Sequence, residues 1–393
     1  MQTFDWVVVG NGLVGAAASY ELARQGLSVL LIDRALEPGN ATRYSYGGIP
    51  YWSGSTPLTQ QLCQEGIAKQ RQLSEELEAD TQFRELDLVL TLAADGDPDA
   101  AATVYADCAT PPNFVSAAEA QALEPLLNRN AIAGAFTVRH GHVSPVALVS
   151  AYNQAFQRLG GTRMIAAVVD VVRIKDRVTG VLTAEQACPA KNVLVAAGAF
   201  SRALLHQAQV KIPLYHTHAE LIETPPLDLQ LRSLIMPAQT ERFALEAKAS
   251  QPDIDEQWDE PGHEVTPAIL DSGAVQFLDG HVCLGQISRT LTDPDAELDE
   301  AESDRTMRSA MAAQIPALAN VPGTWRCCRV SFSRDGLPLV GAIPGVEGLH
   351  VMAGFSAPFV YLPPVAQRFA QTVVGEADSA IAAMALNRFS KAS

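Results

Sequence analysis

The segment from residue 1 to residue 33 carries a glycine pattern that suits the binding of a dinucleotide. Gly10, Gly12 and Gly15 have the spacing G-x-G-x-x-G. The first glycine permits a tight turn, the second lets a pyrophosphate approach the backbone, and the third allows close packing of a helix on a strand. Asp33 follows at the place where a carboxylate accepts hydrogen bonds from an adenosine ribose. The pattern leaves open whether the dinucleotide is NAD or FAD.

The glycines have this meaning only if the residues around them form a strand, a helix and a second strand. An apolar run at 6–9 precedes the glycines, an alanine-rich run at 16–24 follows them, and a second apolar run at 28–32 ends at Asp33. A helix that begins directly after the turn presents unpaired N–H groups to the phosphates. We therefore expect the order strand, turn, helix, strand at the start of the chain.

The composition narrows the class of protein. A chain of 393 residues is long enough for two domains with sizeable cores. Its formal net charge of −16 argues against nucleic acid as a partner, and no apolar run is long enough for an integral membrane segment. The six cysteines have neither the spacing of a zinc site nor that of a disulfide framework. We expect a cytoplasmic protein without a signal peptide and without a metal.

Three further blocks follow in the rest of the chain. They read G-H-V-S-P at 141–145, V-L-V-A-A-G-A-F-S at 193–201, and D-G-L-P-L-V-G at 335–341 with G-F-S at 354–356. With the glycine pattern, and in this order, they resemble the FAD-dependent amino-acid and amine oxidoreductases, the family of D-amino-acid oxidase, glycine oxidase and monomeric sarcosine oxidase. The resemblance covers nearly the full length of the chain and favours FAD over NAD.

The resemblance implies an α/β fold made of two interleaved parts. A Rossmann-like FAD-binding domain would comprise residues 1-80, 138-212 and 327-393. A discontinuous antiparallel α+β substrate domain would comprise residues 81-137 and 213-326. The reacting end of the cofactor would then lie between segments that are far apart in the sequence.

Local patterns add three expectations. A single strand is expected over 164–172, and short strands are expected over 212–283, interrupted by a polar surface loop at 251–264. A last helix is expected to start near 362–364, because proline is tolerated in a first helical turn. The N-terminus of this helix would stabilise negative charge on the pyrimidine ring of a reduced flavin.

The family resemblance also implies a reaction. Its members oxidise a C–N bond of a small amine, imino acid or amino acid by hydride transfer to flavin N5, which gives an imine that water hydrolyses. The flavin supplies this chemistry, and the protein supplies orientation and electrostatics. The electrons then pass to oxygen or to another carrier. Two alternatives stay open, a flavin monooxygenase and a flavin-binding protein that has lost its catalytic activity.

Residues are assigned to the cofactor by the same resemblance. Asp33 and the glycines would hold the ADP half, Val169 would contact the adenosine region, and Gly198 would help to close the site. Arg43 corresponds to a residue beside the isoalloxazine and would line the flavin. The full set expected around FAD is Gly10, Gly12, Gly15, Asp33, Arg34, Arg43, Gly47, Gly48, Val169, Ala197, Gly198, Cys328, Gly354, Phe355 and Ser356.

The reacting end departs from the family pattern. The position of a carboxylate-binding arginine in the glycine oxidase branch falls on Val330, and that of a lysine in the sarcosine oxidase branch falls on Tyr361. Neither side chain can give a carboxylate a charge-assisted hydrogen bond. Arg329 and Arg43 are the nearest cations, so the expected catalytic set is Arg43, Arg329 and Tyr361. The alternative is a substrate that is not a simple amino acid.

Two cysteines bear on the flavin in the sarcosine oxidase branch. Cys283 takes the position of a lysine that promotes the reaction of reduced flavin with oxygen, and a neutral thiol cannot stabilise developing superoxide. This replacement favours a dehydrogenase with another electron acceptor. Cys328 corresponds to a cysteine that binds the flavin covalently, although Cys327 is adjacent. A covalent FAD at Cys328 is therefore a hypothesis.

Overall fold

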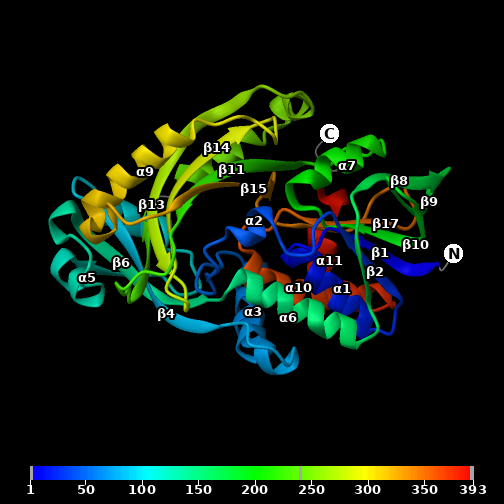
Figure 1. Ribbon diagram of the computed structural model, residues 1–393, viewed down its shortest axis with the longest axis horizontal. Coiled ribbons are helices and arrows are strands. Elements are labelled where there is room, and N and C mark those ends of the chain that lie inside the picture. Colours follow the sequence, from blue (N-terminus) through cyan, green and yellow to red (C-terminus); the bar gives the residue numbers. More distant parts are fainter. Residues whose placement is uncertain (1–2, 239–240, 390–393) are drawn as a thin grey trace.

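The computed structural model describes residues 3–238 and 241–389, and it confirms the α/β fold. The chain forms two large sheets, one at each end of the molecule, with helices packed around them (Figure 1). None of the helices in these described ranges is long and apolar enough to cross a membrane.

The first sheet contains the glycine turn. Its strands are β1 (Phe4–Val9), β2 (Val29–Asp33), β7 (Thr162–Ile165), β8 (Val168–Ile174), β9 (Arg177–Thr183), β10 (Ala187–Val195), β16 (Leu339–Ala342) and β17 (Leu349–Ala353). The strands β17, β10, β1, β2 and β7 lie in this order and run parallel. β16 pairs antiparallel with β17, and the β8–β9 hairpin extends antiparallel from β10.

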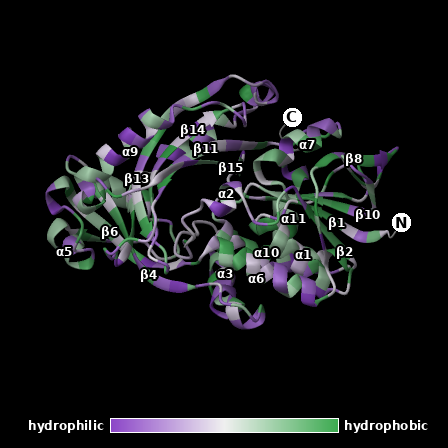
Figure 2. Cartoon of the chain, viewed as in Figure 1, coloured by the Kyte–Doolittle hydropathy of each residue, from purple (hydrophilic) through white to green (hydrophobic). Residues whose placement is uncertain are grey.

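Both faces of the first sheet are covered, which explains the continuous apolar runs in the sequence. Along β1, Trp6 and Val8 face one layer while Val7 and Val9 face the other, because side chains alternate along a strand. The layer beside Trp6 consists of α1 (Leu13–Arg24), α3 (Pro57–Glu76), α6 (Pro145–Arg158), α10 (Pro358–Val373) and α11 (Ser379–Met384). The opposite layer contains α7 (Ser201–Gln207) and the β8–β9 hairpin. Hydrophobic residues accordingly concentrate on these strands and helices (Figure 2).

The second sheet is mainly antiparallel. Its strands are β3 (Gly48–Ile49), β4 (Arg84–Ala93), β5 (Asn113–Ser116), β6 (Ile132–His142), β11 (Leu214–Glu223), β12 (Ser233–Pro237), β13 (Glu264–Gln276), β14 (Val282–Leu291) and β15 (Thr324–Ser333). They lie in the order β15, β11, β14, β13, β12, β4, β6, β3, with β5 beside β6 and a parallel pairing of β12 with β4. β15 therefore forms one edge of this sheet.

The two faces of the second sheet differ in what covers them. The outer face packs against α5 (Ala117–Leu123) and α9 (Glu300–Gln314), which lie outside the curved sheet in Figure 1. We call the opposite face the inner face; it carries Leu221 and Cys283 and packs against Tyr46 and Trp52. The short helices α2 (Asn40–Arg43), α4 (Pro98–Val104) and α8 (Glu241–Ala249) complete the chain. The division into two domains remains a prediction.

Two local expectations are wrong. The single strand over 164–172 is two strands, because β7 pairs in parallel with β2 whereas β8 turns to pair with β9. A hydrophobic pattern does not show where a strand changes partner. The region 212–283 contains the helix α8, and the expected loop includes a 3-10 helix, Pro252–Asp259. This segment is anchored because the buried Trp258 donates its indole N–H to the Ala249 carbonyl at 2.8 Å.

The last long helix also differs from its expected start. α10 begins at Pro358, so the expected start near 362–364 is wrong. Pro363 and Pro364 lie inside the helix, where each lacks the N–H that would bond the carbonyl four residues earlier. The two carbonyls deprived in this way belong to Phe359 and Val360.

Helix α3 supplies a donor for one of these carbonyls and packs closely against the other. The buried Gln70 side chain donates to the Phe359 carbonyl at 2.5 Å. Gly66, one turn earlier on α3, packs so closely that a Cβ there would lie 1.9 Å from the Val360 carbonyl oxygen. A glutamine and a glycine on one helix therefore hold the first turns of the other in place.

Replacing Gln70 tests this contact. In Gln70→Leu the buried Phe359 carbonyl loses its partner, and we expect the free energy of unfolding to fall by about 1–3 kcal/mol. Gln61→Leu, at an exposed position on the same helix, is the matched control and should stay within about 0.5 kcal/mol of the parent. Denaturant unfolding of the three proteins measures both values. Equal stabilities of the two variants would contradict the role of Gln70.

Candidate active site

The β1–α1 turn has the geometry that a pyrophosphate requires. Gly10 has a φ of +106°, and a Cβ on it would lie 2.5 Å from the Ala196 carbonyl oxygen. A Cβ on Gly15 would lie 1.7 Å from the Gly10 carbonyl oxygen. Gly12 is the N-cap of α1 and brings no capping side chain to the helix N-terminus. The turn is thus a backbone cradle with a helix N-terminus beside it, which fits a bound phosphate.

Asp33 fixes this turn from the end of β2. Its carboxylate accepts the Asn11 N–H at 2.5 Å and the Ala35 N–H at 3.1 Å. A carboxylate has about four lone-pair positions, so Asp33 keeps capacity to accept hydrogen bonds from a ribose. The structure therefore brings Asp33 to the glycine turn, in a position that fits the role expected for it.

Three other residues expected at the cofactor come just after strands of the first sheet. Ala197 and Gly198 follow β10, and the Ala197 Cα lies 3.0 Å from the place of a Cβ on Gly10. Gly198 has a φ of +56° and open space where a Cβ would stand. The guanidinium of Arg34 lies 4.9 Å from the Phe200 ring centroid. Val169 lies on β8 and is 46% exposed.

The separate sequence blocks meet in the structure. Gly47 has a φ of +66°, and a Cβ on it would lie 2.0 Å from the Val143 carbonyl oxygen in the G-H-V-S-P block. Gly48 pairs with His142 between β3 and β6. The hydroxyl of Ser356 donates to the Gly336 carbonyl at 3.2 Å, which joins the G-F-S block to the D-G block.

The N-terminus of α10 follows the G-F-S block directly. Gly354 has a φ of +76°, Phe355 is buried, and Ser356 is exposed. Ala357 is the N-cap, and it offers no side chain to the helix N–H groups. The partial positive charge of this helix end therefore remains available for an electron-rich group.

Strand β15 directs its side chains to two different sides. Cys328 lies opposite Ala219 and Val330 lies opposite Thr217, so both point to the inner face of the second sheet. Arg329 points to the outer face. There its side chain donates to the Pro294 carbonyl and lies 3.5 Å from the Asp295 carboxylate. Arg329 therefore points away from the face to which Val330, at the expected position of the carboxylate-binding arginine, points.

The three residues expected to be catalytic have different surroundings. Arg43 forms an ion pair with Glu223 at 2.6 Å, and Arg326 lies 3.4 Å from the same carboxylate. Arg329 has the contacts described above. Tyr361 is buried inside α10, and its burial raises the pKa of its hydroxyl well above the usual range. Their assignment as catalytic remains a prediction.

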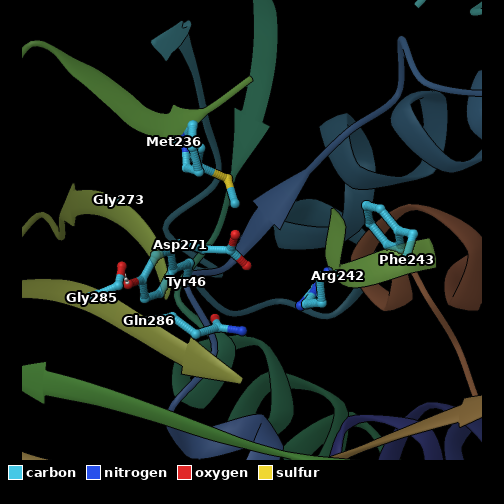
Figure 3. A pocket seen from close by; sticks show the side chains of 9 residues that line it. Tyr46, Met236, Arg242, Phe243, Asp271, Gly273, Gly285 and Gln286 are labelled. Atoms are coloured by element: carbon cyan, nitrogen blue, oxygen red, sulfur yellow. Dashed lines mark hydrogen bonds between the residues drawn. The ribbon is translucent and has the colours of Figure 1, made fainter. Parts of the chain in front are cut away.

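A pocket opens on the inner face of the second sheet (Figure 3). The Tyr46 hydroxyl donates to the Gly285 carbonyl at 2.6 Å, at a β-bulge where β14 shifts its register against β11. Gly285 has a φ of +116° at this bulge. The pocket is lined by Tyr46, Met236, Pro237, Arg242, Phe243, Asp271, Gly273, Gly285 and Gln286.

The charged residues that line this pocket are Arg242 and Asp271, and Glu246 lies beside Arg242. Burial raises the pKa of Asp271, and Arg242 opposes that shift. Burial also raises the pKa of Glu246, which lies 4.0 Å from Arg242 and accepts a hydrogen bond from Thr217 at 3.0 Å. Arg242 and Asp271 make no ion pair with each other, and neither has a hydrogen bond to another residue in the described ranges.

Reasoning from the sequence did not find the residues of this pocket. Arg242 and Asp271 lie in a region that was expected to form strands and a loop, and no motif surrounds either of them. Their proximity depends on the pairing of β13 with β14 and on the position of α8. In the described part of the chain, no group of three or more His, Cys, Asp or Glu residues could hold a metal ion.

Comparison with known proteins agrees with this geometry. The DAO family model, described as FAD dependent oxidoreductase, matches residues 5–372. The chain is 24% identical over 382 residues to glycine oxidase of Pseudomonas putida, and the match covers 94% of each chain. The crystal structure of glycine oxidase from Geobacillus kaustophilus superposes with a TM-score of 0.80 over 99% of both chains, at 20% identity.

A longer relative matches in part. 4-Methylaminobutanoate oxidase (formaldehyde-forming) of Paenarthrobacter nicotinovorans is 27% identical over 225 residues, which are 55% of this chain and 27% of that protein. The family match spans most of the chain, so the protein belongs to the DAO family of FAD-dependent oxidoreductases. The glycine cradle, the Asp33 carboxylate and the open helix end at α10 are surroundings that fit FAD.

The glycine cradle can be tested by filling it. In Gly15→Ala the added methyl group collides with the Gly10 backbone, and we expect a loss of about 1–3 kcal/mol in stability together with loss of bound flavin. Gly39→Ala is the matched control, because no atom lies within 4 Å of the place of its Cβ. The ratio of flavin to protein after desalting and the unfolding midpoint measure the effect. A Gly15→Ala protein with full flavin and unchanged midpoint would refute the cradle.

Proposed function

We propose that the protein oxidises a C–N bond of a small amine, imino acid or amino acid at FAD held between the β1–α1 turn and the N-terminus of α10. The backbone cradle at Gly10 and Gly15 is the observation that carries this proposal, within a family match that spans most of the chain. Glycine oxidase and 4-methylaminobutanoate oxidase, both similar to this chain, are named for nitrogen-bearing substrates.

Each part of the chain would have a distinct task. Gly10, Gly12 and Asp33 would hold the ADP half, while the N–H groups at the start of α10 would face the pyrimidine end of the ring system. Arg43, neutralised by Glu223, would lie along the ring. FAD, when bound, accepts a hydride from the carbon beside the substrate nitrogen. The inner face and α8 would position the substrate and exclude water.

The electron acceptor is proposed to be a carrier other than oxygen. Cys283 stands on the inner face, where burial raises the pKa of its thiol to about 12, so it carries no charge at neutral pH. The guanidinium of Arg43 opposes this rise in the pKa of the thiol, and it is paired with the Glu223 carboxylate. The positive charge that acts on Cys283 is therefore offset by Glu223, which weakens its ability to stabilise developing superoxide.

Anaerobic titration of the purified flavoprotein with a panel of amines, imino acids and amino acids tests the function. We expect at least one compound to bleach the flavin absorbance and to yield the carbonyl product of imine hydrolysis. Air should then restore the colour slowly, whereas a quinone or dye should restore it quickly. Bleaching only by NADPH would favour a monooxygenase, and a flavin that no compound bleaches would favour a protein that has lost its activity. Fast peroxide formation would contradict the proposed acceptor.

A covalent link to the flavin is proposed at Cys328 rather than at Cys327. Cys328 points to the inner face with Val330, whereas Cys327 lies opposite Glu220, which faces the other side. Burial raises the pKa of the Cys328 thiol well above its usual range, so it is a thiol at neutral pH. Attachment would therefore depend on the loss of its proton when the cofactor is in place.

Acid precipitation distinguishes the two cysteines. The yellow colour should remain in the pellet for the parent protein and for Cys327→Ser, and it should move to the supernatant for Cys328→Ser. The Cys327→Ser variant is the matched control because it changes the adjacent thiol only. Complete release of flavin from the parent protein would rule out a covalent link.

A further inference from the structure

The inner-face pocket is lined by a cation, Arg242, and an anion, Asp271, that do not pair with each other. The guanidinium of Arg242 has no hydrogen bond to a residue in 3–238 or 241–389, and its nearest carboxylate, Glu246, is 4.0 Å away. The Asp271 carboxylate likewise has no donor within those ranges. A guanidinium has five N–H donors and a carboxylate accepts several hydrogen bonds, so both groups have capacity for a ligand.

The two groups face one space from different elements. Arg242 comes from α8, and Asp271 comes from β13. Figure 3 shows both side chains at the same pocket, with Asp271 between Tyr46 and Arg242 in this view. They form no ion pair with each other, and both line the open space of the pocket.

The family resemblance implies substrate anchors that this chain does not supply at the expected positions. Val330 and Tyr361 stand at the positions where cations would be expected, and Arg329 points to the outer face. Arg242 reaches the inner face from α8. This helix is joined to the inner face by the hydrogen bond between Thr217 on β11 and Glu246. A cation on α8 can therefore replace a cation on β15 without a change in the sheet.

We infer that Arg242 and Asp271 form a two-point site for a zwitterionic amino acid, in which Arg242 binds the carboxylate and Asp271 binds the ammonium group. The inference rests on the proposed oxidation of a C–N bond and names its substrate class as amino acids rather than simple amines. Each contact is a charge-assisted hydrogen bond in a partly buried pocket, where such bonds are strong.

Glu246 and Thr217 complete the arrangement. Thr217 holds the Glu246 carboxylate at 3.0 Å, and Glu246 lies one helical turn after Arg242. Glu246 is therefore a positioning residue that directs the guanidinium toward the pocket. Met236 and Phe243 supply the apolar part of the wall, which suits a small side chain of the substrate.

The test uses three probes that share one branched carbon and carry no hydrogen on the carbon beside nitrogen. They are 2-aminoisobutyrate, which has both charges, pivalate, which has the carboxylate only, and tert-butylamine, which has the ammonium only. None can be oxidised at the C–N bond, so calorimetric titration of the flavoprotein reports binding alone. We expect 2-aminoisobutyrate to bind more tightly than either singly charged probe.

The variants separate the two contacts. Arg242→Gln should weaken the binding of 2-aminoisobutyrate and of pivalate at least tenfold, because a charged hydrogen bond is lost. It should leave the binding of tert-butylamine unchanged. Asp271→Asn should weaken the binding of 2-aminoisobutyrate and of tert-butylamine at least tenfold, and it should not weaken the binding of pivalate. Arg242→Lys keeps the charge and should fall between the parent and Arg242→Gln. Lys248→Gln, exposed on the same helix, is the matched control and should bind all three probes as the parent does.

The outcomes distinguish this site from the proposed oxidation. Unchanged binding of pivalate and 2-aminoisobutyrate by a folded, flavin-containing Arg242→Gln protein would overturn the inference, as would a parent protein that does not bind 2-aminoisobutyrate. If the probes bind as expected but no amino acid bleaches the flavin, the site stands and the proposed oxidation fails. If simple amines bleach the flavin while the probes do not bind, the oxidation stands and this site fails.

Discussion

The fold depends on a contact between the backbones of Gly10 and Gly15 that leaves no room for any side chain. A Cβ at Gly15 would lie 1.7 Å from the Gly10 carbonyl oxygen, and a Cβ at Gly10 would meet Ala196 at the end of β10. The contact brings α1 and two parallel strands together, so the strand ends and the helix N-terminus converge on one point. Asp33 then joins the same turn through the Asn11 N–H. The cofactor end of the site is therefore made mostly of backbone.

The second end of the site depends on a different kind of support. α10 carries two prolines in its interior, and helix α3 donates the Gln70 hydrogen bond to one of the freed carbonyls while Gly66 packs closely against the other. Because these contacts secure the first turns of α10, its uncapped N-terminus stays beside the G-F-S block. An electron-rich flavin ring would meet this helix end, while the inner face of the second sheet lies opposite. Side chains, rather than backbone, give that face its chemistry.

Sequence reasoning succeeded where short motifs determine geometry. The order strand, turn, helix, strand followed from the glycine pattern and its flanking apolar runs, and the α/β class and the FAD-dependent family followed from the resemblance carried by that pattern and three further blocks. It failed at the start of α10, because the support for Pro363 and Pro364 comes from Gln70, which is far away in the chain. It also missed Arg242 and Asp271, which no local pattern marks. Arg329 was chosen for its closeness in sequence to Val330, yet neighbouring residues of a strand face opposite sides.

The proposed reaction removes hydrogen from a carbon beside nitrogen and delivers it to FAD. The most direct measurement compares the rates of anaerobic flavin reduction by a substrate with hydrogen and with deuterium on that carbon. The account predicts that deuterium slows flavin reduction several-fold, because this C–H bond breaks in the step observed. Two results would contradict this reaction. In the first, no compound with a C–H bond beside nitrogen reduces the flavin. In the second, the two rates are equal and the substrate shows no measurable loss of that hydrogen.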